Sequence, residues 1–433
     1  MNLILAIPPP ARIAAAFLLG ALAGSLVNFA VYRLAWNQRH IGPWSPPPPK
    51  APPRHWFDRV PILGWLTLRR EAAQSGRGFW IRPLSVELLA GAALAGLYWW
   101  YTEALGLLPP EVPHPAPPQW AWLFHGQFAL HAVLLALLAA ATLIDFDEKT
   151  IPDAITVPGT LLGVTAAAVF PWGLLPDLVL FLDMPHGFWP QFWGLLEPAD
   201  WPVLTLASPH EWPDRLGGAP RLLPLAIALG CWWAWCFALM PRTWYARHGW
   251  RRAIELLLAR LRREPITVYL VVLGAVGSLG ILATWFVGGL HWKGLLSSLV
   301  GLAVGAGLIW IVRIVATWVL DREAMGFGDV TLLAMIGSFL GWQAAVMVFF
   351  LAPFAALAVT LCVIVFHRES EIPYGPYLCL PVVFLLIRWP ALWEATAHVF
   401  ILGGWLAAVF LVCIALMGLM LSVWRRIRDA LFG

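Results

Sequence analysis

Long apolar runs, separated by short polar or proline-rich segments, follow one another along the whole chain. A helix that crosses a bilayer needs about 20 predominantly apolar residues, and about eleven runs approach that length. We expect spans near residues 11–34, 84–101, 124–144, 154–172, 222–240, 266–290, 295–320, 330–350, 352–366, 377–387 and 398–423. The pattern therefore predicts an all-α polytopic membrane protein with about eleven transmembrane helices.

The composition agrees with a chain that is embedded in a lipid bilayer. Hydrophobic residues make up 60% of the sequence and charged residues only 12%, whereas soluble proteins carry about 25% charged residues. The net charge of +4 is modest, and the sequence does not predict the clustered basic face that a nucleic-acid partner needs. The expected partner is therefore membrane lipid. The five cysteines lie in apolar segments without zinc-site spacing, which predicts buried hydrophobes and no metal site.

Arginine sets the predicted orientation. Residues 36–83, 242–264 and 424–428 carry an excess of arginine, which marks the cytoplasmic segments of a polytopic protein. Counting spans from these segments places the N-terminus outside and the C-terminus inside. Residues 242–264 also have apolar positions at helical spacing, which predicts a basic amphipathic helix on the inner leaflet. The acid-rich residues 177–221 are expected on the outer side.

These features divide the chain into four parts. Residues 1–121 hold the first span, a cytoplasmic loop and the second span, and residues 122–176 hold the first of two aspartate regions. Residues 177–265 form an insertion with the outer loop, one span and the basic helix. Residues 266–433 hold the second aspartate region and the C-terminal spans.

Two aspartates stand where long apolar runs meet short polar ones. Asp145 follows the third predicted span and Asp329 follows the seventh, so the span count puts both at the cytoplasmic face. A carboxylate beside the hydrocarbon layer is costly and by default indicates function. Two such carboxylates close together cannot both ionise cheaply, so they share a proton and can act as base and acid in amide hydrolysis. Gly326 and Gly328 would let a substrate backbone approach Asp329 closely.

Simpler roles are open for each aspartate. Any one of Asp145, Asp147, Asp153 or Asp329 can be an interfacial helix cap, and Asp153 is expected to cap a helix that begins near residue 154. Asp147 has no partner identifiable from the sequence and is expected to be solvated, and Arg313 is expected to extend toward the interface. A transporter that uses the aspartates as a proton relay is another alternative, but it predicts carboxylates at the bilayer midplane.

Several motifs resemble the type IV prepilin peptidases, which are intramembrane aspartic peptidases of the Gly-x-Gly-Asp type. The matching segments are Ile144-Asp145, Ile151-Pro152-Asp153, Ala324-Met325-Gly326-Phe327-Gly328-Asp329 and Ile372-Pro373-Tyr374-Gly375-Pro376-Tyr377. The opening segment from Gly24 to Leu34, the loop segment from Trp56 to Leu66, and Glu87 also match. The resemblance covers most of the chain outside residues 177–264.

This resemblance implies an activity, substrates and a set of site residues. Asp145 and Asp329 would be the catalytic pair, and Gly326, Gly328, Asp153, Pro373 and Gly375 would support the site or the substrate. The enzyme would cut the basic leader from type IV prepilin or pseudopilin precursors at the cytoplasmic face of the bacterial inner membrane. The peptidase step would need no cofactor. A related protease that cuts other membrane substrates is the alternative within this class.

The sequence departs from the family pattern at two places that affect chemistry. Many bifunctional members carry two Cys-x-x-Cys pairs in the cytoplasmic loop, but residues 46–49 and 70–76 contain no cysteine here, so a four-thiolate zinc site is excluded. Thr331 stands where a lysine usually follows the second aspartate. The resemblance therefore leaves open whether the chain also methylates the new amino terminus with S-adenosylmethionine.

Overall fold

The computed structural model describes eleven long helices and a small loop region. It describes residues 4, 6–49, 51–110, 120–179, 203–205, 212–217, 221–240, 252, 255, 259, 263–321, 325–366 and 375–432. Most of the predicted basic helix at 242–264 and most of the predicted outer loop at 177–221 lie outside these residues, so both stay predictions.

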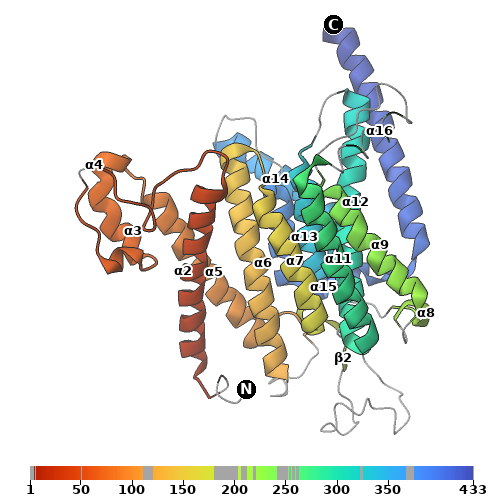
Figure 1. Cartoon of the computed structure of the whole chain (residues 1–433), viewed down its shortest axis with the longest axis horizontal. Coiled ribbons are helices and arrows are strands. Elements are labelled where there is room, and N and C mark those ends of the chain that lie inside the picture. Colours follow the sequence, from red (N-terminus) through yellow and green to blue (C-terminus); the bar gives the residue numbers. More distant parts are fainter. Residues whose placement is uncertain are drawn as a thin grey trace.

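The helices form a bundle whose axes run mostly up and down in Figure 1. In chain order they are α2 (Pro9–Leu34), α5 (Ile81–Thr102), α6 (Ala121–Glu148), α7 (Asp153–Val169), α9 (Leu222–Ala238), α11 (Pro265–Val287), α12 (Gly289–Leu320), α13 (Phe327–Leu340), α14 (Trp342–Phe366), α15 (Gly375–Ile401) and α16 (Gly404–Phe432). Among the described residues, eight helices are long and apolar enough to cross a membrane, and α7, α9 and α13 are shorter apolar helices. The predicted fold class is confirmed, and the chain is an integral membrane protein.

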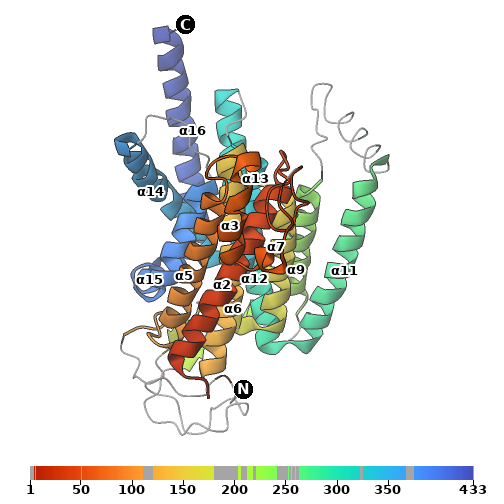
Figure 2. The ribbon, with the colours of Figure 1, turned by 90° about the vertical axis from the view of Figure 1, so that its left-hand side faces the viewer.

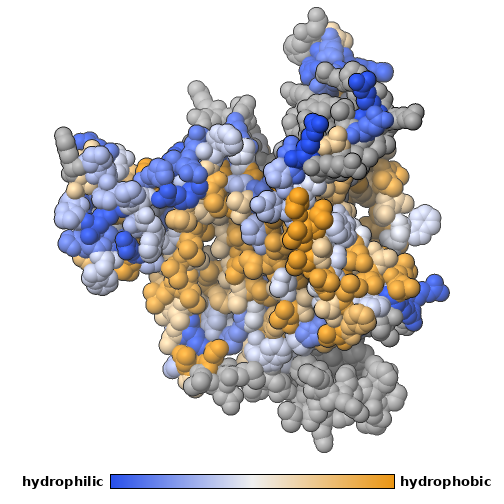
Figure 3. All heavy atoms as spheres, in the orientation of Figure 1, coloured by the Kyte–Doolittle hydropathy of each residue, from blue (hydrophilic) through white to orange (hydrophobic). Residues whose placement is uncertain are grey.

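Apolar side chains cover the face of the bundle seen in Figure 3, and hydrophilic side chains gather on the loop after α2 and near the C-terminus. Figure 2 shows α11 at one side of the bundle and α14 and α16 at the other. Two short antiparallel strands, β1 (Asp177–Val179) and β2 (Val203–Thr205), are the only strands among the described residues. In the chain, β1 follows η4 (Pro171–Gly173) and β2 precedes α8 (Asp214–Gly217).

Two predicted boundaries in the C-terminal half are wrong. The break expected near residue 351 falls at Gly341, which has a φ of +86° and ends α13, while Pro353 lies inside α14. A positive φ costs little at glycine, and a proline is tolerated within a membrane helix when neighbouring helices support it. The short span expected at 377–387 continues to Ile401, because the chain kinks at Arg388 beside Pro390 and then resumes the helix.

The central helix is α13, in which every residue from Asp329 to Leu340 is buried. It packs tightly on α12, where a side chain at Gly301 would collide with the carbonyl oxygen of Gly337. Small residues let helix backbones approach to this degree in membranes. Since α13 begins immediately before Asp329, this close packing fixes where that carboxylate lies.

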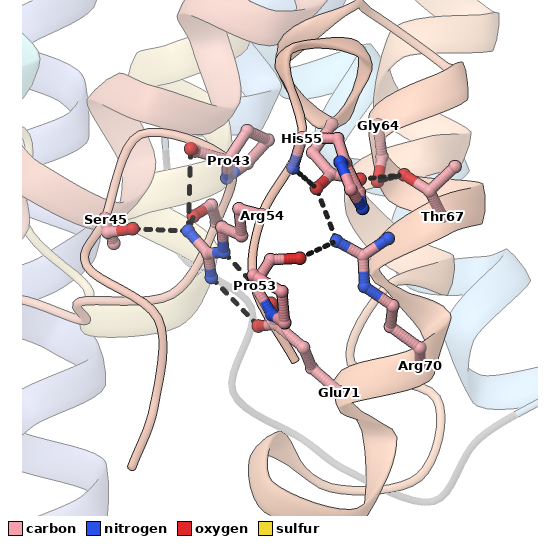
Figure 4. A network of polar contacts seen from close by, with 11 residues as sticks. Pro43, Ser45, Pro53, Arg54, His55, Gly64, Thr67, Arg70 and Glu71 are labelled. Atoms are coloured by element: carbon pink, nitrogen blue, oxygen red, sulfur yellow. Dashed lines mark hydrogen bonds and ion pairs between the residues drawn. The ribbon is translucent and has the colours of Figure 1, made fainter. Parts of the chain in front are cut away.

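Ion pairs and hydrogen bonds between side chains hold the loop between α2 and α5. It contains η1 (Trp56–Arg59), α3 (Leu63–Leu68), η2 (Arg69–Glu71) and α4 (Ala72–Ser75). Arg54 makes two hydrogen bonds of 2.9 Å to the carboxylate of Glu71 and donates to the carbonyls of Gly42 and Ser45. Arg70 pairs with buried Asp58. These contacts, drawn in Figure 4, hold together the segments that would carry the zinc cysteines in bifunctional members.

A buried glutamate ties this loop to the helices. Glu87 on α5 is completely buried and accepts a hydrogen bond of 2.8 Å from the indole of Trp65. It also accepts one from the backbone N–H of Ile62 and one of 3.4 Å from Asn28 on α2. A buried carboxylate is stable only with such partners, so Glu87 anchors the loop to α2 and α5.

Candidate active site

Asp145 lies in the last turn of α6, with its side chain turned into the protein. The residue is only 5% exposed. Its own carbonyl accepts a hydrogen bond of 2.7 Å from Lys149, which ends α6 in a left-handed conformation. Figure 1 shows that α6 ends at the side of the bundle where the C-terminus lies. The carboxylate is therefore at a helix end, as the sequence predicts, and faces other helices instead of solvent.

Asp329 lies in the first turn of α13 and is 6% exposed. The helix begins at Phe327, after Gly326 in extended conformation at the N-cap. The negative charge of Asp145 acts electrostatically on the carboxylate of Asp329. The charges of both aspartates act on the thiol of Cys379 on α15. The structure thus brings together two carboxylates that lie far apart in the sequence. Like charges in a poorly solvated place favour one shared proton over two ionised groups.

Gly375, the first residue of α15, touches Asp145 directly. Its backbone N–H donates a hydrogen bond of 2.8 Å to Oδ2 of Asp145. A Cβ at this position would lie 2.5 Å from the same oxygen, so any other residue would displace the carboxylate. Sequence reasoning placed Gly375 near the site, and the contact supports that prediction. Pro373 lies outside the described residues.

The two glycines before Asp329 have different surroundings. Gly326 is exposed, and a Cβ there would lie 3.7 Å from Oδ2 of Asp329. A Cβ at Gly328 would lie 2.8 Å from Cβ of Ile151, so Gly328 lets α13 pack against the segment that follows α6. Gly326 can therefore have the expected role of letting a substrate approach Asp329. At Gly328, the close packing against Ile151 is a sufficient reason for the absence of a side chain.

The predicted cap at Asp153 is wrong. The N-cap of α7 is Pro152, no side chain caps this helix end, and Asp153 is the exposed first helical residue. The helix begins one residue earlier than expected, because Pro152, with φ of −72° and ψ of 135°, itself takes the cap conformation. An aspartate in the first turn still interacts favourably with the helix dipole, but it makes no cap hydrogen bond.

Two acids after Asp145 connect the end of α6 to the N-terminal part of the chain. Asp147 accepts two hydrogen bonds of 2.9 Å from Arg82 on α5. Glu148 accepts hydrogen bonds of 2.6 and 2.8 Å from the backbone of Trp36 and Asn37, just after α2. Asp147 is exposed, as predicted, but it also has a partner, Arg82, that the sequence did not identify. These contacts fix the turn of α6 that carries Asp145.

Arg313 on α12 holds the segment before Asp329, which the sequence did not reveal. Its Nε donates a hydrogen bond of 2.8 Å to the carbonyl of Met325, and its guanidinium lies 5.9 Å from the centre of the Phe327 ring. The side chain therefore touches the residues on both sides of Gly326. An arginine that packs on an aromatic ring and bonds a carbonyl restrains both.

The residues at this site fit hydrolysis by two carboxylates. Within the described part of the chain, His, Cys, Asp and Glu form no group of three that could hold a metal ion. Asp145 lies in the last turn of one helix and Asp329 in the first turn of another. A relay across the membrane would place its carboxylates midway along the spans, so this position argues against the transporter alternative.

Comparison with known proteins gives the same family as the motifs. Residues 261–361 match the Type IV leader peptidase family, and residues 18–101 match the Bacterial Peptidase A24 N-terminal domain. The first match includes Asp329, whereas Asp145 and Gly375 lie outside both. The resemblance predicted from the motifs is confirmed.

Curated relatives are each named Prepilin leader peptidase/N-methyltransferase. The protein of Myxococcus xanthus is 27% identical over 58% of this chain and 65% of its own length. The protein of Aeromonas hydrophila is 34% identical over 21% of this chain and 36% of its own, and that of Neisseria gonorrhoeae is 26% identical over 37% and 57%. The chain thus spans less than two thirds of the length of each. No solved structure is significantly similar.

Proposed function

We propose that this chain is a membrane-embedded aspartic endopeptidase; it carries one region matched to the Type IV leader peptidase family and one matched to the Bacterial Peptidase A24 N-terminal domain. The observation that carries the proposal is the pairing of Asp145 and Asp329, two buried carboxylates at the ends of separate helices, placed so that the charge of Asp145 acts on Asp329. Intramembrane carboxylates are costly and persist where they serve a function.

The pair can perform every proton transfer that amide hydrolysis needs. The ionised carboxylate takes a proton from a water molecule, whose oxygen attacks the carbonyl carbon of the scissile bond. The protonated carboxyl donates its proton to the carbonyl oxygen, which gives a tetrahedral intermediate. A proton then passes to the amide nitrogen and the C–N bond breaks, releasing an amine and a carboxylic acid. The hydrogen bond from Gly375 to Asp145 keeps that carboxylate oriented.

The proposed substrates are type IV prepilin or pseudopilin precursors. Their basic leader would stay in water while the apolar helix stays in lipid, which suits carboxylates at the ends of helices. The name of the curated relatives supports this substrate class. We place the protein in the bacterial inner membrane with the site facing the cytoplasm, an orientation supported by the arginine-rich segments.

Methyl transfer is a second proposed step, supported by the name that the relatives share. The acceptor would be the amino terminus that cleavage creates, and S-adenosylmethionine would be the methyl donor. The loop that carries zinc cysteines in many bifunctional members is held by Arg54–Glu71 and Arg70–Asp58 ion pairs here. Its residues do not fit a zinc site, so methyl transfer in this chain would proceed without that metal.

The test is cleavage of a prepilin precursor by the purified protein, with mass spectrometry of the products. We expect wild type to cleave immediately before the apolar helix, and Asp145→Asn and Asp329→Asn to lose cleavage while still accumulating in the membrane. A gain of one methylene with S-adenosylmethionine would establish methyl transfer. Cleavage that survives either substitution would overturn the proposed pair.

A further inference from the structure

A large apolar groove opens beside the aspartate pair. Its volume is about 1100 Å³, and its walls are α5 on one side and α15 on the other, with α6 between them. Both α5 and α15 pack against α6, and the three helices can be followed in Figure 2. Residues of α2 and α14 complete the lining. The groove belongs to the membrane-embedded part of the protein.

One end of the groove reaches the proposed active site. Thr142, Leu143 and Phe146 line it from the same turns of α6 that carry Asp145. On the opposite wall, Pro376 lines it directly after Gly375, the residue that donates to Asp145. The lining of the groove therefore comes within one residue of Asp145 on α6 and of Gly375 on α15.

The surface of the groove is shaped for a close-packed helix. Small residues recur along it: Ala92, Ala93 and Gly96 on α5, and Ala136 and Ala139 on α6. Nothing in the described part of the chain lies within 4 Å of the position that a Cβ at Gly96 would take. Small residues at helix interfaces allow another helix backbone to approach closely in lipid. Large apolar side chains at the rim, such as Leu89 and Phe146, are more than 60% exposed.

The size of the groove fits a segment of helix. A helix is about 10–12 Å wide and rises 1.5 Å per residue, so a volume of this size holds about eight residues. Ala139 precedes Asp145 by six residues, or about 9 Å along α6. A helix lying in the groove would thus have its membrane-embedded part against α5, α6 and α15, and its end next to the carboxylates.

We propose that this groove binds the apolar helix of the membrane substrate and presents the residues before that helix to Asp145 and Asp329. The inference rests on the proposed function and adds the place where substrate specificity is set. The occupant is an apolar transmembrane helix, because the groove is lined almost wholly by apolar side chains and includes the chain neighbours of Asp145 and Gly375, Phe146 and Pro376. A lipid acyl chain is the competing occupant, and the experiment separates the two.

The first test fills the groove and measures kinetics on a full-length membrane precursor in proteoliposomes. Gly96→Leu and Ala139→Trp are expected to raise KM about tenfold with kcat nearly unchanged, because uniform substrate binding is lost. Gly280→Leu on α11 is the matched control, since a Cβ there also meets no described atom within 4 Å and the position is outside the groove. Unchanged KM in both groove variants, or the same change in the control, would overturn the proposal.

The second test does not depend on catalysis. A photo-crosslinking amino acid at position 139, in the Asp145→Asn background, is expected to form an adduct with the precursor, and one at position 280 is not. Adducts with lipid alone would overturn the groove proposal. A precursor adduct at position 139, together with a wild type that does not cleave, would overturn the proposed function and leave the groove assignment standing.

Discussion

The backbone N–H of Gly375 donates a hydrogen bond of 2.8 Å to Oδ2 of Asp145, although 230 positions separate the two residues. The contact joins the start of α15 to the end of α6, and Pro376 and Phe146, the residues that follow the two partners, line the groove. Because a Cβ at Gly375 would lie 2.5 Å from the same oxygen, the position cannot carry a side chain unless the carboxylate moves. One backbone contact therefore sets both the orientation of Asp145 and the width of the site.

Gly375→Ala should reduce cleavage about 100-fold while the protein remains folded, because a displacement of about 1 Å at a catalytic group can cost that much. The measurement is kcat/KM on a precursor, together with the thermal unfolding midpoint. Gly307→Ala on α12 is the control, since a Cβ there meets no described atom within 4 Å. Wild-type cleavage by Gly375→Ala would show that the position of Asp145 is not critical.

The Arg54–Glu71 ion pair should carry much of the local stability of the loop between α2 and α5. Glu71 is 1% exposed and bonds both ends of the Arg54 fork, and removing one partner of a buried pair costs about 3–5 kcal/mol. We expect Arg54→Met to expose residues 54–75 to hydrogen exchange, and the exposed Arg77→Met to leave them protected. Metal chelators should change neither result; a loop that loosens with chelator would show that a bound metal also stabilises it.

The same loop should weaken in acid. Burial raises the pKa of Asp58, but hydrogen bonds from Thr67, from the His55 backbone and from Arg70 outweigh it, so the pKa is lowered overall. A lowered pKa gives stability that is present above the unfolded value, about 3.9, and is lost as pH falls through the folded value. Exchange in the loop, corrected for intrinsic rates, should therefore rise below about pH 4. Asp58→Asn should remove this pH step; a step that persists would assign it to another group.

Asp153 should matter little, because it is exposed and makes no cap hydrogen bond in α7. Its charge in the first turn is worth about 0.5 kcal/mol through the helix dipole. We expect Asp153→Ala to lower stability by about that amount, with cleavage within about twofold of wild type. Asp153→Asn should behave like Asp153→Ala, since the charge is what counts. A loss as deep as that of Asp145→Asn would place Asp153 in the reaction.

The sequence was sufficient for features that depend on local pattern. The apolar runs predicted the helices, and the Gly-x-Gly-Asp and Ile-Asp motifs identified two carboxylates that the fold brings together. It was insufficient where a partner lies far along the chain. Asp147 is exposed as predicted, but its partner Arg82 lies 65 positions away in the sequence, and the packing of α5 on α6 brings the two together. The break at Gly341 was missed because the apolar run continues on both sides of it, so that hydropathy alone does not mark the turn.

Arg313 should position Asp329 without touching substrate. Its hydrogen bond to Met325 and its stacking on Phe327 restrain the segment around Gly326, so loss of the side chain would let the first turn of α13 move. A hydrogen bond from a charged donor contributes about 1.5–3 kcal/mol, and we expect Arg313→Met to lower kcat about tenfold. The KM should stay unchanged, because the groove does not include this residue. Arg313→Lys keeps a cation that can reach the same carbonyl and should restore part of kcat. An equal loss in the lysine and methionine variants, or a rise in KM, would show that Arg313 has a different role.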